Sequence, residues 1–79
     1  MRYSELLQRV NEYALAGLIV EALRLLTVIK ADMMRIYDYL DVTDPIYAPC
    51  REYNEQVLEV IRMQLKEVDK RTEELRKAL

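Results

Sequence analysis

The fold is decided by residues 19–40, which read IVEALRLLTVIKADMMRIYDYL. Apolar side chains recur in this stretch every three or four residues, which is the spacing of one face of an α-helix. Flanking apolar residues widen this face to about half of the helix circumference, more than the ~100° of an ordinary amphipathic helix. A single neighbouring helix therefore leaves part of the apolar face uncovered.

Helical periodicity continues upstream of this stretch, and we predict one long helix over about residues 4–40. Gly17 is the exception, because a glycine inside a helix costs roughly 1 kcal/mol relative to alanine. We interpret it as a glycine tolerated within the helix. The alternatives are a kink that would give the chain three helices, or a close helix–helix approach beside Ala14.

The strongest breaks in periodicity fall in residues 41–49. Asp44 followed by Pro45 is a good pair for a helix cap and first turn, and Pro49 would clash inside a continuous helix. These residues predict a short corner over about residues 41–48, followed by a second helix over about residues 49–79.

The second predicted helix carries apolar residues at alternating spacings of three and four, with Thr72 as the polar member of the repeat. Val57, Val60 and Met63 widen its apolar surface only in the first half of the helix.

These elements predict a single all-α domain over residues 1–79, built as a long antiparallel helical hairpin. Two such rods bury only the stripes that face each other, so we expect hairpins to assemble into a four-helix bundle or a larger helical oligomer. A homodimer is the simplest such assembly. The predicted oligomer interface comprises Leu18, Ile19, Ala22, Leu23, Leu26, Ile29, Met33, Ile36, Leu40, Leu58, Ile61, Leu65, Val68 and Leu75.

Composition excludes several classes of protein. Hydrophobic residues make up 52% and charged residues 33%, which argues against disorder. The net charge of −2 lacks the basic surplus of a direct nucleic-acid binder. The absence of histidine and the single cysteine, Cys50, argue against the usual zinc, haem and di-iron sites. We predict no metal and no cofactor.

A membrane span is not expected either. The most apolar stretch, residues 14–29, is interrupted by Glu21, Arg24 and Thr27 and is shorter than the ~20 residues that cross a bilayer. The first residues lack the apolar core of a signal peptide. We predict a cytoplasmic location, in the host cytoplasm if the source is viral.

The aromatic residues are six tyrosines, with no Phe and no Trp. Tyrosine combines apolar bulk with a polar tip and suits half-buried and interface positions. Packing at the edge of the core is the simpler interpretation, and a ligand or partner patch near the corner is the functional one. That patch would comprise Tyr39, Tyr47, Arg51, Glu52 and Tyr53.

Glu52, Glu55 and Glu59 form a row of carboxylates near the start of the second predicted helix. Carboxylates on one helix face bind a divalent cation when a facing helix supplies more oxygens. Acidic residues are also favoured at helix N-termini for electrostatic reasons alone. Without an obvious facing cluster, we predict solvated carboxylates.

The stretch 45–52, PIYAPCRE, resembles the loop between the first two helices of the all-helical chorismate mutases. That family has a very long first helix, works as an intertwined dimer and usually reads Pro-Ile-x-Asp-Pro-x-Arg-Glu in this loop. Arg51 and Glu52 match, whereas Ala48 stands at the position of the family's aspartate. The resemblance implies a dicarboxylate site that involves Arg51 and Glu52, with Lys30 as the cation of the long helix. Tyr39 and Tyr47 are further candidates for a small-anion site near the corner.

The leading functional prediction is a non-enzymatic assembly or interaction protein that forms a homo-oligomer. Scaffolds, adaptors, small regulators and viral accessory or structural proteins all fit this description. Besides a second copy of itself, the chain could bind another protein, for example a DNA-binding protein. The alternative is a ligand-binding or enzymatic helical bundle with its site near the corner.

Overall fold

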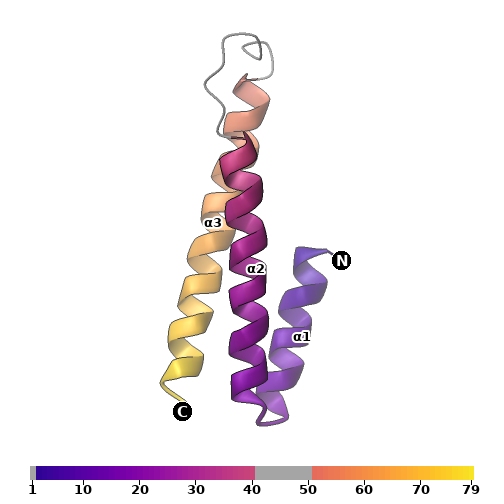
Figure 1. The fold of residues 1–79 in the computed structure, drawn as a ribbon, viewed down its shortest axis with the longest axis vertical. Helices are drawn as coiled ribbons and strands as arrows, with labels where there is room; N and C mark the ends of the chain where they lie inside the picture. The colour runs from indigo at the N-terminus through magenta and orange to yellow at the C-terminus, as the bar shows by residue number, and fades with distance from the viewer. Residues whose placement is uncertain (1, 41–50) are drawn as a thin grey trace.

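Three α-helices make up the part of the chain that the computed structural model describes, residues 2–40 and 51–79 (Figure 1). They are α1 (Tyr3–Leu15), α2 (Ile19–Leu40) and α3 (Arg51–Arg76), and the described residues contain no strand. The all-α prediction is confirmed. The predicted corner over residues 41–48 and the side chains of residues 51–53 lie outside the described residues.

The helices follow one another up and down. α2 runs antiparallel to both α1 and α3 and packs against both, whereas α1 and α3 approach each other much less closely (Figure 1). α1 is the shortest helix and flanks only the part of α2 that follows the turn, so the far part of the α2–α3 hairpin extends beyond it (Figure 1).

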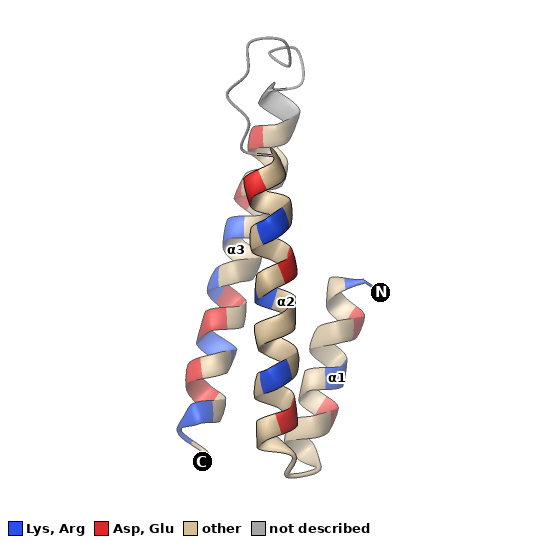
Figure 2. Cartoon of the chain, viewed as in Figure 1, with Lys and Arg blue, Asp and Glu red and all other residues tan. Residues whose placement is uncertain are grey.

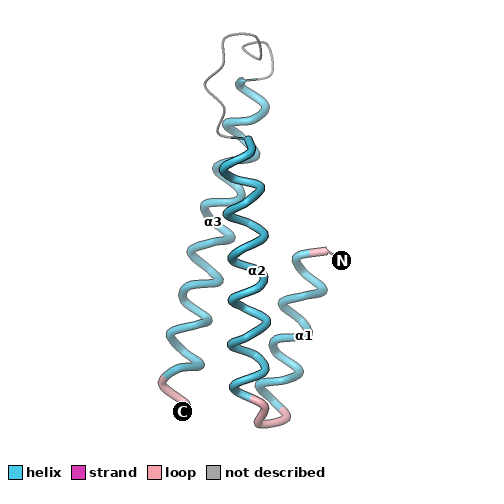
Figure 3. The backbone as a smooth tube through the Cα atoms, in the orientation of Figure 1, coloured by secondary structure: helices cyan, strands magenta, loops and turns pink. Residues whose placement is uncertain are grey.

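The prediction of one continuous helix over residues 4–40 is wrong, because the chain reverses direction at Gly17 (Figure 3). Gly17 has a φ of 79°, in the left-handed region that glycine adopts without steric cost. The amide of Leu18 donates to the carbonyl of Tyr13 at 2.8 Å, and the amide of Gly17 donates to the carbonyl of Ala14 at 3.1 Å. These two bonds form a Schellman motif, which ends α1 and satisfies its last carbonyls.

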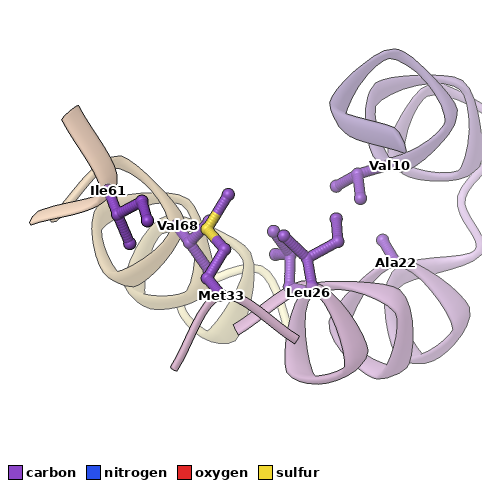
Figure 4. Packing of buried hydrophobic residues seen from close by; sticks show 7 residues of the cluster. Val10, Ala22, Leu26, Met33, Ile61 and Val68 are labelled. Atoms are coloured by element: carbon purple, nitrogen blue, oxygen red, sulfur yellow. The ribbon is translucent and has the colours of Figure 1, made fainter. Parts of the chain in front are cut away.

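The core lies where the three helices face one another. Val10 from α1, Leu26 from α2 and Val68 from α3 are each about 1% exposed and point toward a shared interior (Figure 4). Among the described residues, the other buried apolar side chains are Ala22, Ile29, Met33, Leu58 and Ile61.

This packing explains the wide apolar face of α2. α1 covers one side of that face and α3 covers another, with Leu6 and Leu7 of α1 partly buried against the core. Each large apolar side chain that becomes fully buried contributes roughly 1.5–3 kcal/mol to the free energy of folding. This gain exceeds the free-energy cost of a turn at one glycine. The chain therefore supplies from its own N-terminus much of the cover that the sequence assigned to a second copy.

The second predicted helix agrees with α3 to within two or three residues at each end. The Thr72 hydroxyl donates to the carbonyl of Val68 at 2.8 Å, so the polar member of the repeat is satisfied within its own helix. None of the helices in the described residues has the length and apolar character needed to cross a bilayer.

Candidate interaction surface

Polar contacts join α2 to α3 along one side of the hairpin. The Lys30 ammonium lies 2.7 Å from a carboxylate oxygen of Asp69. The Arg62 Nε donates to the Tyr37 hydroxyl at 3.0 Å, and the Arg62 guanidinium carbon lies 5.4 Å from the centre of the Tyr37 ring. Lys30 and Tyr37 are seven residues apart on α2, as are Arg62 and Asp69 on α3, so both contacts lie on one side of the hairpin.

Tyr3 closes the end of α1 onto α3 on a different side of the hairpin. The Tyr3 hydroxyl is a hydrogen-bond donor to two acceptors on α3. They are a carboxylate oxygen of Glu67 at 3.3 Å and the carbonyl oxygen of Gln64 at 3.4 Å. Partial burial, together with the negative charge of Glu67 and the hydrogen bond to it, raises the pKa of Tyr3 to about 12. The protonated tyrosine therefore anchors the start of α1 at the level of Gln64.

Apolar side chains remain exposed on the hairpin at and beyond this anchor. Ile36 is 51% exposed and Val60 is 53% exposed, while Tyr39 and Met63 are 78% and 64% exposed. We call Ile36, Tyr39 and Val60 the open-end patch. Met63 lies on the outer face of α3, opposite the face that packs on α2, and is not part of it.

Helical spacing places the open-end patch on the side of the hairpin that α1 covers further down. Ile36 lies seven residues after the buried Ile29 on α2, and Val60 lies four residues before Gln64 on α3. The patch is thus a continuation of the surface on which α1 packs, at a level that α1 does not reach.

A groove of about 410 Å³ marks the boundary between the covered and uncovered parts of this surface. Tyr3 of α1, Met33 and Ile36 of α2, and Ile61 and Gln64 of α3 lie along it. Its charged lining consists of Asp32 and Arg35, which pair with each other at 3.7 Å. The lining of the groove is therefore mainly apolar, and its two charged residues, Asp32 and Arg35, form an ion pair with each other.

Charges of both signs are interspersed along the described helices, and no helix carries a block of one sign (Figure 2). The ion pairs of Glu59 with Arg62 at 3.0 Å and of Arg24 with Glu21 at 3.5 Å lie between exposed side chains of a single helix. Such pairs contribute roughly 0–1 kcal/mol each. The open-end patch, in contrast, contains no charged residue.

The residues predicted for the oligomer interface fall into three groups. Half of them are buried within the single chain, where they form its core, and only Leu18 and Ile36 are exposed. The partly buried members are Ile19, Leu23, Leu40, Leu65 and Leu75. Most of the predicted interface is thus occupied by the chain's own helices, and Ile36 is the member that joins the open-end patch.

The predicted ligand or partner patch is placed only in part. Tyr39 is exposed on the last turn of α2, Tyr47 lies outside the described residues, and the side chains of Arg51, Glu52 and Tyr53 lie outside them too. The ion pair of Lys30 with Asp69 engages the cation that the resemblance would assign to a dicarboxylate.

Acidic side chains are distributed along all three helices of the described part of the chain. It contains no group of three or more Cys, Asp or Glu side chains arranged to hold a metal ion. Of the predicted carboxylate row, Glu59 pairs with Arg62.

Sequence reasoning noticed Val60 but did not assign it to the interface. The signal was that the apolar surface of the second helix widens only in its first half, and this half is the one that extends beyond α1. The contact of Tyr3 with Gln64 and Glu67 was missed, because no local pattern places α1 beside α3.

The chain matches no protein-family model, and no curated protein or solved structure is significantly similar to it. The open-end patch is therefore the feature from which a function can be inferred.

Proposed function

We propose that the chain is a non-enzymatic helical interaction module that self-associates through the open-end patch. The observation that supports this proposal is the exposure of Ile36, Tyr39 and Val60 on the part of α2 and α3 that extends beyond α1. Scattered exposed apolar residues are normal on a protein surface, whereas a contiguous patch points to a docking site.

The size of the patch is compatible with weak association. Taking about 200 Å² for a fully exposed side chain of this kind, the three residues expose roughly 360 Å² in one copy. Two copies facing each other would bury roughly 700 Å² through these residues, which is less than the ~1,000 Å² of a stable specific interface. We therefore expect a weak, reversible monomer–dimer equilibrium in the micromolar range rather than an obligate dimer.

The character of the patch also favours an apolar partner surface. It contains no charged residue, and the two charged residues that line the adjoining groove, Asp32 and Arg35, pair with each other. A second copy of the same surface meets these requirements without leaving a buried charge unpaired.

Light scattering over a dilution series tests the proposal. The mass of the unmodified protein should rise from monomer toward dimer across the micromolar range. Val60→Lys and Ile36→Lys should shift this transition to at least about tenfold higher concentration, because each places a charge at both halves of the interface.

Val28→Lys is the matched control, because Val28 is 55% exposed on α2 and stands outside the open-end patch. It should leave the transition unchanged, and circular dichroism should show the same helicity for all four proteins. A protein that stays monomeric at every concentration would refute the proposal, as would equal effects of Val28→Lys and Val60→Lys.

A further inference from the structure

We infer that α1 is exchanged between two copies of the chain: the turn at Gly17 opens into a continuous helix, and α1 of each copy packs on α2 and α3 of the other. This exchange is a second mode of association, and it does not use the open-end patch. It follows from the turn, from the spacing of the apolar residues around it and from the leucines that the turn leaves exposed.

The connection between α1 and α2 is short enough to act as a hinge. It consists of residues 16–18 alone, with helix on both sides (Figure 3). Short hinges favour domain exchange, because changes in a few backbone dihedrals separate the closed turn from an open connection. At Gly17 the change runs from a φ of 79° to the φ of about −63° of an α-helix, and glycine adopts both without steric cost.

The apolar face continues through the turn without a change of phase. If residues 3–40 formed one helix, one set of apolar side chains on both sides of Gly17 would follow at spacings of three or four residues. These are Leu7, Val10, Ala14, Leu18, Ala22, Leu25 and Ile29. All of them except Leu18 are buried or partly buried in the structure. The open form therefore presents the packing residues of α1 and of α2 on one face of a single helix, as packing against a second copy requires.

The exchanged dimer retains the contacts of the single chain. Because α1 is antiparallel to α2, two open copies pair antiparallel with Gly17 near the twofold axis, and each α1 meets the part of α2 that it meets in its own chain. The packing of Val10 against Leu26 and the hydrogen bond from the Tyr3 hydroxyl to Gln64 then join two copies. The balance between the two forms therefore depends on the hinge and on the protein concentration.

Leu15 and Leu18 add a contact that the single chain lacks. Leu15 is 90% exposed and Leu18 is 49% exposed. In the open form they lie three residues apart on one side of the helix, and both are within two residues of Gly17. The Leu15 and Leu18 side chains of both copies therefore come together near the twofold axis, where their burial favours the dimer.

The open-end patch stays uncovered in the exchanged dimer. Ile36 lies 19 residues after Gly17, about 29 Å from the twofold axis along the helix. The α1 of the second copy ends where the chain's own α1 ends in the single chain. The two modes of association are therefore independent and can be tested separately.

Gly17→Ala tests the exchange, because alanine is strained in the turn and favoured in the helix. Every protein in this test also carries Val60→Lys, so that the open-end patch does not contribute to association. Light scattering over a dilution series should give a dissociation constant at least about 100-fold lower for Gly17→Ala than for the protein with Gly17, since both hinges of the dimer gain. Below that concentration, Gly17→Ala keeps the turn and is the less stable protein.

Gly17→Asn is the matched control. Asparagine tolerates the left-handed conformation of the turn and is a poorer helix former than alanine, so it should not lower the dissociation constant. Circular dichroism of the three proteins confirms that each is folded.

Distances between two spin labels on one copy show whether the hinge is open. Labels at Glu5→Cys and Ala31→Cys occupy exposed positions of α1 and α2, and Cys50→Ser removes the native thiol. In the closed turn they lie at nearly the same level of two neighbouring helices, within about 20 Å of each other. In the open form 26 residues separate them, which is about 39 Å along the axis. Dilution with excess unlabelled protein restricts the measurement to one copy.

A Gly17→Ala dimer in which the two labels are about 39 Å apart is the expected result. A Gly17→Ala protein that stays monomeric throughout the dilution series would overturn the exchange, and so would a dimer in which the labels stay within about 20 Å. Neither of these results bears on the open-end patch, because that patch is tested by the effect of Val60→Lys in the chain that retains Gly17.

Discussion

Replacing Gly17 with alanine tests the turn that separates α1 from α2. A turn at this position and a continuous helix through it predict changes of opposite sign in the free energy of unfolding. At a φ of 79°, an L-residue costs roughly 1–2 kcal/mol relative to glycine. The lower entropy of the unfolded alanine chain offsets about 0.4–1 kcal/mol of this cost. No atom lies within 4 Å of the added methyl group, so sterics contribute nothing further.

We therefore expect Gly17→Ala to lower the free energy of unfolding by about 1 kcal/mol, or the Tm by roughly 4–8 °C for a domain of this size. Thermal melts followed by circular dichroism at one fixed protein concentration would measure it, since association also changes the Tm. Gly17→Asn is the control, because asparagine tolerates the left-handed conformation better and should cost less.

A higher Tm for Gly17→Ala would refute the reasoning. In a continuous helix, alanine is favoured over glycine by roughly 1 kcal/mol, so stabilisation would mean that α1 and α2 form one helix in solution.

Three other substitutions test the packing, the α1 anchor and the polar side of the hairpin. Leu26→Ala should lower the free energy of unfolding by about 3 kcal/mol in urea titrations, whereas Val28→Ala, at an exposed position of the same helix, should change it by less than about 0.5 kcal/mol. The raised pKa of Tyr3 means that folding favours its protonated form, a contribution complete below pH 10 and lost as the pH rises toward 12. Tyr3→Phe should therefore make the decrease of Tm between pH 10 and pH 12 less steep. An equally steep decrease in both proteins would contradict the role of Tyr3 in holding α1 against α3. Lys30→Met should lower the free energy of unfolding by no more than about 1 kcal/mol, because the ion pair with Asp69 is about half exposed, and this difference should shrink at high salt. A larger loss of stability that does not depend on salt would contradict the assignment of this pair as a surface ion pair.

The open-end patch shows how far sequence reasoning reaches toward function. Ile36 was predicted as an interface residue from its place in the apolar repeat, and it is exposed. Leu26 was predicted on the same grounds, and it is buried within the chain. The repeat cannot separate these two cases, because it records that a side chain is apolar but not which helix lies opposite it.

Local rules determined much of this protein. The spacing of three and four residues fixed the helical character of residues 19–40 and of α3, since an apolar stripe forms on a helix at that period. The sequence also determined that the face of α2 needs more than one neighbour. Gly17 followed by Leu18 was a local signal for a Schellman turn, which the continuous periodicity around it obscured.

Only the tertiary structure decided whose helices cover α2. A glycine inside a helix costs only about 1 kcal/mol relative to alanine, so this local preference does not by itself force a turn at Gly17. Burial of Val10 against Leu26 is the larger effect, and it exists only when α1 folds back. That choice also determines which part of the hairpin stays uncovered, because Tyr3, the first residue of α1, lies beside the near edge of the open-end patch.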